Sequence, residues 1–167
     1  MEKSNALTIL KHAFLMERKG KALYEKAMEH AKDNSVKAFF KELADDEQEH
    51  MNILEKQFKA LMNSSRFTAG GFENDAGRVN APDILDENLK TKITAAGFEA
   101  TAITAAIGFE EKAVKLYAQR SEETSDPEEK KLYHWLSTWE KTHLKKLMAL
   151  DDALMEAAWQ DNSFWPF

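Results

Sequence analysis

Apolar residues recur at the three- and four-residue spacing of an amphipathic helix in four long segments of the chain. The four apolar stripes run from Leu7 to Met28, from Val36 to Leu61, from Ile93 to Tyr117 and from Leu132 to Leu154. No segment alternates apolar and polar residues cleanly, as a half-buried strand would. The pattern therefore predicts an all-α protein with four long helices.

Short polar breaks separate the first stripe from the second and the third from the fourth. The first break contains Asp33, Asn34 and Ser35, all of which favour the N-cap position of a helix. The other break contains Asp126 followed by Pro127, an N-cap acid before a proline suited to the first helical position. Because short connections join antiparallel neighbours, each pair of helices is predicted to form a hairpin.

The middle connection is long and contains the turn residues Gly70, Gly71 and Gly77. Its 19 residues from Ser64 to Pro82 extend to about 60 Å, more than the roughly 45 Å length of a 30-residue helix. We therefore predict an antiparallel four-helix bundle, two hairpins joined by a long crossover. This single domain over 1–167 divides into hairpin one at about 4–63, the crossover at about 64–85, hairpin two at about 86–160 and an aromatic tail at 161–167.

Each stripe also carries one glutamate at a position where an apolar residue is expected, and two of these glutamates have a histidine three residues later. These residues are Glu17, Glu47, His50, Glu110, Glu140 and His143. The spacing repeats, because 30 residues separate the two glutamates of each hairpin and a shift of 93 residues maps one hairpin onto the other. Each glutamate lies about 15 residues, or about 22 Å, from its own turn, so all four are predicted to lie in one layer of the bundle.

Four carboxylates buried in one layer would repel one another unless cations neutralised them. Together with two imidazoles they suit two divalent ions that share bridging carboxylates, and iron or manganese is favoured, with zinc as an adventitious substitute. A purely structural polar network is the alternative. Asp46 is a further candidate, able to orient an imidazole across the bundle, although its repeat equivalent is Trp139.

Composition narrows the chemistry further. The chain has no cysteine, which excludes thiolate nucleophiles, iron–sulfur clusters and disulfides within these residues. The net charge of −6 makes nucleic acids and anionic membranes poor partners. No secretory signal or membrane span is recognisable, so we expect a cytoplasmic protein.

With these motifs the chain resembles the ferritin-like superfamily, most closely its rubrerythrin-like branch. Two tyrosines strengthen the likeness, because Tyr24 follows the first glutamate by seven residues and Tyr117 follows the third by seven. The resemblance implies that Glu17 and Glu110 are terminal iron ligands and that Glu47 and Glu140 bridge two irons. It also implies that His50 and His143 each bind one iron, while both tyrosines hydrogen-bond ligand carboxylates.

Two features depart from that family. Full-length rubrerythrins carry a rubredoxin domain with an iron held by four cysteines, and these 167 residues contain none. Rubrerythrins also have an additional glutamate three residues after the third-helix ligand, where this chain has Ala113. The expected site is thus the symmetric six-ligand version, without the ligand exchange linked to that extra glutamate.

The resemblance implies a non-haem di-iron oxidoreductase with two iron ions as its cofactor. It would reduce hydrogen peroxide or dioxygen with electrons from an external donor such as rubredoxin, or oxidise Fe(II). The alternative is a non-catalytic bundle that binds, senses or stores iron. We further expect a homodimer.

Overall fold

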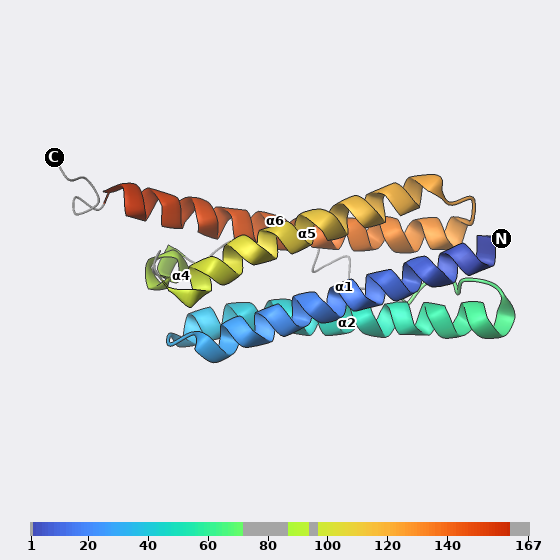
Figure 1. Ribbon diagram of the computed structural model, residues 1–167, viewed down its shortest axis with the longest axis horizontal. Coiled ribbons are helices and arrows are strands. Elements are labelled where there is room, and N and C mark those ends of the chain that lie inside the picture. Colours follow the sequence, from blue (N-terminus) through green and yellow to red (C-terminus); the bar gives the residue numbers. More distant parts are fainter. Residues whose placement is uncertain (1, 72–86, 94–96, 161–167) are drawn as a thin grey trace.

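The described part of the chain is helical throughout its long elements. The computed structural model describes residues 2–71, 87–93 and 97–160, and no strand occurs in these ranges. Its helices are α1 (Glu2–His30), α2 (Asn34–Ser64), α4 (Glu87–Lys92), α5 (Phe98–Glu123) and α6 (Pro127–Gln160). The four long helices form the bundle expected from the apolar stripes, with α1 and α2 in one hairpin and α5 and α6 in the other (Figure 1). The all-α prediction is confirmed.

The turn between α1 and α2 ends in the N-cap predicted from the sequence. Asp33 has extended backbone angles, and its side chain accepts a hydrogen bond of 2.8 Å from the backbone N–H of Ser35. At its other end α2 stops at Ser65, which adopts the left-handed conformation with φ 58° and donates its N–H to the carbonyl of Leu61. Both ends of α2 thus satisfy backbone groups that the helix leaves unpaired.

The turn between α5 and α6 also follows the prediction. The Asp126 side chain accepts hydrogen bonds from the backbone N–H groups of Glu128 and Glu129 at 2.9 and 3.0 Å, directly before the helix. The Glu129 carboxylate then receives two bonds from the guanidinium of Arg120 on α5, at 2.8 and 2.9 Å. This buried bidentate pair ties the two helices together beside their turn.

The start of the third stripe differs from its expected form. Ile93 was expected to begin one continuous helix, but it follows the short helix α4, and α5 begins only at Phe98. Gly97 precedes α5 in an extended conformation with φ −81° and ψ 162°, which interrupts the helix although the apolar spacing continues. Ile93 still packs into the core. The expected crossover residues 72–86, Ala96 and the aromatic tail 161–167 lie outside the described residues.

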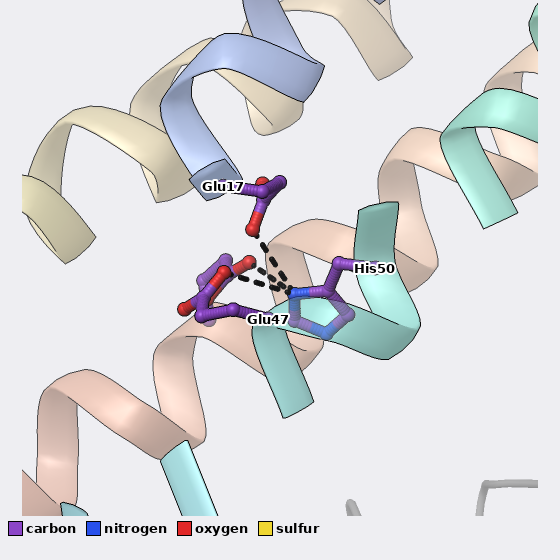
Figure 2. Close-up of side chains that lie close together, drawn as sticks. Glu17, Glu47 and His50 are labelled. Carbon is purple, nitrogen blue, oxygen red and sulfur yellow. Dashed lines mark hydrogen bonds and ion pairs between the residues drawn. The ribbon is translucent and has the colours of Figure 1, made fainter. Parts of the chain in front are cut away.

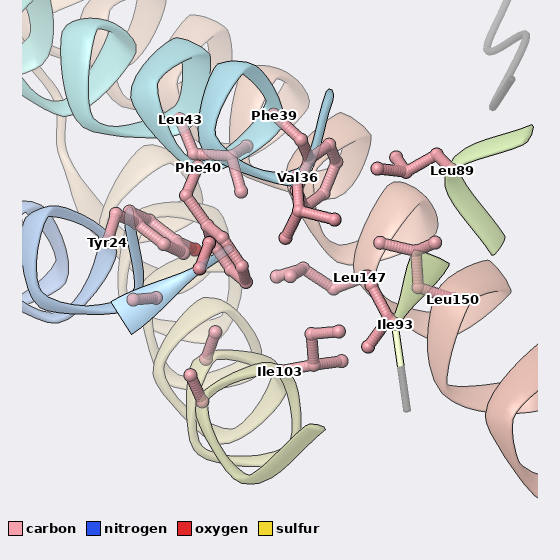
Figure 3. Packing of buried hydrophobic residues seen from close by; sticks show 14 of the residues in the cluster. Tyr24, Val36, Phe39, Phe40, Leu43, Leu89, Ile93, Ile103, Leu147 and Leu150 are labelled. Carbon is pink, nitrogen blue, oxygen red and sulfur yellow. The ribbon is translucent and has the colours of Figure 1, made fainter. Parts of the chain in front are cut away.

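The apolar core is divided into two clusters by a polar layer. One cluster surrounds Tyr24, Phe40 and Leu147 towards the α1–α2 turn and includes α4 (Figure 3). The other surrounds Leu10, Leu132 and neighbouring residues towards the α5–α6 turn. Between the two clusters, buried acidic and histidine side chains replace apolar ones. Apolar packing on both sides keeps this layer away from water.

Candidate metal centre

The polar layer contains all six residues singled out in the sequence, and all four long helices contribute to it. Glu17 comes from α1, Glu47 and His50 from α2, Glu110 from α5, and Glu140 and His143 from α6. None of the six exposes more than 3% of its surface. The prediction from the 30-residue spacing, that these side chains meet in one layer, agrees with the structure.

The six residues form two overlapping groups of four. One group is Glu17, Glu47, His50 and Glu140, and the other is Glu47, Glu110, Glu140 and His143. In each group, one ligand atom from every residue lies within 4.8 Å of those of the others. Glu47 and Glu140 belong to both groups, which is the arrangement needed for two ions that share two carboxylates.

Distances around His50 describe the first group. Its Nδ1 atom lies 2.9 Å from Glu140 Oε1, 3.2 Å from Glu17 Oε2 and 3.6 Å from Glu47 Oε2. Figure 2 shows the carboxylates of Glu17 and Glu47 directed at this ring nitrogen. One nitrogen of His50 therefore faces three carboxylates from three different helices.

Distances around His143 follow the same pattern. Its Nδ1 atom lies 3.2 Å from Glu140 Oε2 and 3.6 Å from both Glu47 Oε1 and Glu110 Oε1. These contacts are the ones that the 93-residue shift predicts from those of His50. The repeat in the sequence is thus an approximate two-fold relation in the polar layer.

The two tyrosines connect the hairpins. The Tyr24 hydroxyl donates a hydrogen bond to Glu110, and the Tyr117 hydroxyl donates one to Glu17. Each tyrosine lies on the same helix as one glutamate but bonds to the glutamate of the opposite helix, α1 to α5 and α5 to α1. Hydrogen bonding to ligand carboxylates was expected of both residues, whereas the exchange between hairpins was not.

Electrostatics divide the four carboxylates into two kinds. Burial, together with the Glu47 carboxylate, holds the pKa of Glu17 well above its ordinary value. Burial and the Glu140 carboxylate likewise raise the pKa of Glu110 to about 8. Without a metal, Glu110 therefore carries a proton at neutral pH, and the surroundings of Glu17 favour its protonated form in the same way.

For the other two carboxylates and for both histidines, the surroundings favour the charged form. Burial opposes ionisation of Glu140, but the charges of His50 and His143, whose Nδ1 atoms lie 2.9 and 3.2 Å from its two oxygens, outweigh it and lower its pKa. Hydrogen bonds similarly lower the pKa of Glu47 despite its burial. Burial also disfavours charge on the two imidazoles, yet the surrounding carboxylates raise both pKa values well above the ordinary one. The metal-free layer is thus close to neutral, with two anions and two cations.

Several buried polar atoms in the layer lack a hydrogen-bond partner among the described residues. Four of them belong to the group around His143 and are Glu47 Oε2, both carboxylate oxygens of Glu140, and His143 Nδ1; a fifth atom is His50 Nε2. Such atoms are costly to bury unless something satisfies them. All four face the region shared by the two groups of ligands, and oxygen with imidazole nitrogen is the donor set of iron and manganese. The residues therefore fit a pair of metal ions.

Three further residues, Asp46, Trp135 and Gly20, lie beside the six residues of the layer, and only the first of them is predicted from the sequence. Asp46, a sequence candidate, accepts a hydrogen bond of 3.2 Å from His143 Nε2. Trp135 packs near His50, and an ideal Cβ at Gly20 would lie 3.4 Å from the Glu47 carboxyl carbon. The 93-residue shift indicates only Gly20, which corresponds to Ala113, another residue three positions after a glutamate of the layer. It relates Trp135 to Glu42 and so gives no signal for the tryptophan.

The remaining histidines lie away from the layer. His12, His30 and His134 are exposed, and none of them has a glutamate three residues before it. No helix in the described ranges is both long enough and apolar enough to cross a membrane.

Comparison with known proteins agrees with this arrangement. A solved two-domain protein from Anabaena variabilis ATCC 29413, containing DJ-1/ThiJ/PfpI-like and ferritin-like domains, is similar with a TM-score of 0.64 and 20% identity. The match covers 90% of this chain and only 40% of that one, and at this identity it shows the fold alone. No curated protein matches. The family model for rubrerythrin matches residues 8–151, which include all six residues of the layer, and the chain therefore belongs to the rubrerythrin family.

Proposed function

We propose that this protein is a non-haem di-iron oxidoreductase that reduces hydrogen peroxide. The observation that carries the proposal is the pair of four-residue groups that share Glu47 and Glu140 inside a water-excluding core. Membership of the rubrerythrin family supports iron as the metal, with manganese or zinc as substitutes.

In this proposal each residue has a defined task. Glu17 and His50 hold one ion from one side, and Glu110 and His143 hold the other. Glu47 and Glu140, which belong to both groups of ligands, would contribute carboxylate oxygens to both ions. The bound irons would supply the electrons for reduction of the oxidant, and dioxygen is a second oxidant of the same kind.

The chain's other groups prepare this site. The hydroxyls of Tyr24 and Tyr117 hold the Glu110 and Glu17 carboxylates in fixed orientations. The apolar clusters above and below the layer exclude bulk water. Since these 167 residues contain no cysteine, they hold no thiolate-bound iron, and we propose that electrons arrive from an external donor such as rubredoxin.

A peroxide titration tests the proposal. Anaerobic protein loaded with Fe(II) is mixed with hydrogen peroxide, and ferric absorption and residual peroxide are followed. Reduction of one peroxide to two waters takes two electrons, so we expect one peroxide consumed per two irons, and sustained turnover only after addition of rubredoxin and its reductase.

Two results would contradict peroxide reduction while leaving the metal site intact. Repeated turnover sustained by free Fe(II) and dioxygen, without benefit from rubredoxin, would show a ferroxidase. Bound iron that peroxide does not oxidise would show a non-catalytic iron-binding or iron-sensing bundle. We also propose a homodimer, which light scattering after size-exclusion chromatography tests; a monomeric mass would refute it, and a large closed shell would indicate storage.

A further inference from the structure

The two halves of the polar layer have matching ligands but different surroundings. A shift of 93 residues relates Asp46 on α2 to Trp139 on α6, and each lies directly before the shared glutamate of its own helix. Both side chains are buried, with 6% and 2% of their surface exposed. The approximate two-fold relation therefore breaks at this pair of positions, where Asp46 has a carboxylate and Trp139 has an indole.

Asp46 contacts the outer nitrogen of His143. Its Oδ2 atom lies 3.2 Å from His143 Nε2, and because a carboxylate only accepts, the ring must carry its proton on Nε2. When the ring gives up its second proton to bind a metal, the lone pair is left on Nδ1, the atom that faces Glu47, Glu110 and Glu140. A buried carboxylate in this position fixes the tautomer and orientation of the ring and makes Nδ1 a stronger donor to a metal.

His50 has no such support. Its Nε2 atom is buried and has no hydrogen-bond partner among the described residues. The ring instead meets two indoles edge to face, Trp139 with ring centroids 5.3 Å apart and Trp135 at 5.7 Å. The indoles themselves pack together at 5.0 Å. They restrict the His50 ring by contact but supply no negative charge to its outer nitrogen.

Trp139 also contributes to the Asp46 side. Burial raises the pKa of Asp46, but hydrogen bonds from His143 and Trp139 and the nearby imidazole charges outweigh it, so that the pKa of Asp46 lies below its ordinary value. One tryptophan thus packs against the unsupported histidine and helps to hold the anion that supports the other.

We propose that Asp46 is a positioning residue that makes the two metal positions unequal, so that the position at His143 binds its ion first and more tightly than the position at His50. This inference rests on the proposed metal site. It concerns the order of filling, which neither the ligand set nor family membership determines.

Calorimetric titration with zinc chloride, a redox-inert probe for carboxylate and imidazole sites, tests the inference. In the wild-type chain we expect two ions to bind in two resolved steps. Asp46→Asn keeps the size of the side chain but removes its charge, and should weaken the tighter step about 10- to 100-fold. The matched control is Asp45→Asn, which removes a neighbouring exposed charge paired with Lys41 and should leave both steps unchanged.

Nuclear magnetic resonance separates positioning from a general loss of structure. In the zinc-loaded, ¹⁵N-labelled protein, the His143 Nε2–H proton should resonate downfield of its His50 counterpart because it is bonded to a carboxylate. In Asp46→Asn the His143 signal should move towards that of His50. The backbone amide signals should keep the dispersion of the folded wild-type protein.

The outcomes distinguish this inference from the proposed function. Two zinc ions that bind with equal affinity, or an Asp46→Asn effect no larger than that of Asp45→Asn, would overturn the inequality and leave the metal site standing. A loss of affinity shared equally by both steps would overturn it as well. A wild-type chain that binds no zinc, iron or manganese would overturn both proposals.

Discussion

Metal loading should release protons, because the metal-free layer is neutralised by protons rather than by cations. The surroundings favour the protonated form in four of its groups: Glu17, Glu110, His50 and His143. Metal ligation requires ionised carboxylates and an unprotonated ring nitrogen. Two divalent ions should therefore replace up to four protons, and the buried layer stays electrically neutral in both states.

The magnitude can be worked from the individual groups. With a pKa of about 8, Glu110 is about nine-tenths protonated at pH 7 and about one-tenth protonated at pH 9. We therefore expect Glu110 to contribute close to one proton to the release at pH 7 and almost none at pH 9, so the total release should fall by about one proton between these two pH values. By the same reasoning, metal affinity should fall steeply as the pH is lowered.

Calorimetry in buffers with different ionisation enthalpies measures this release. Glu110→Gln removes one proton-bearing carboxylate and should lower the release at pH 7 by about one proton, besides weakening metal binding. The matched control is Glu111→Gln, an exposed neighbour on the same helix, which should change neither quantity. Release of fewer than two protons per two ions by the wild type would refute this electrostatic description.

Three further predictions follow from the same structure. The proton on Glu110 contributes stability that is fully present below its unfolded pKa of about 4.5 and is lost as the pH rises to about 8. Urea unfolding of the metal-free protein should thus show a fall of about 1.4 kcal/mol per pH unit for each such proton between pH 5 and 8, and a flat profile would contradict it. Tyr117→Phe removes a buried hydrogen bond and should lower the free energy of unfolding by about 1–3 kcal/mol. The control Tyr133→Phe should lower it little, because the buried Tyr133 hydroxyl has no partner among the described residues. Equal losses in the two variants would argue against the tyrosine–carboxylate bond. Gly20→Leu should displace the Glu47 carboxylate, which the glycine faces, and weaken the binding of both ions. Gly108→Leu should not, because nothing lies within 4 Å of an ideal Cβ at that position. Equal metal affinities of the two variants would refute a role for the small residue at position 20.

Much of the fold could be predicted from sequence because the apolar spacing and the caps act locally. At Asp33 and Asp126 the side chain accepts a hydrogen bond from a backbone N–H only two residues later, and both predicted N-caps form in the structure. The interruption before α5 could not be predicted, because the apolar spacing continues from Ile93 through Ile103 and Gly97 alone marks the break.

The height of the site could also be predicted, because equal spacing from two turns places residues at one level of antiparallel helices. The hydrogen-bond partners that link one hairpin to the other could not be predicted. They depend on how far apart the helices lie and on side-chain rotamers. The pairing of Tyr24 with Glu110 across two helices is of this kind. So is the contact of His50 with Trp135, a tryptophan that stands where the repeat has Glu42.

The central claim is that two irons lie between the shared carboxylates of Glu47 and Glu140. Metal analysis of the protein, purified without chelators and then reconstituted anaerobically with Fe(II), tests it most directly. We predict two irons per chain in the wild type and loss of both in either Glu47→Ala or Glu140→Ala, because each carboxylate belongs to both groups of ligands. A wild-type chain that binds no iron, or a bridging variant that retains two irons with unchanged affinity, would contradict the account.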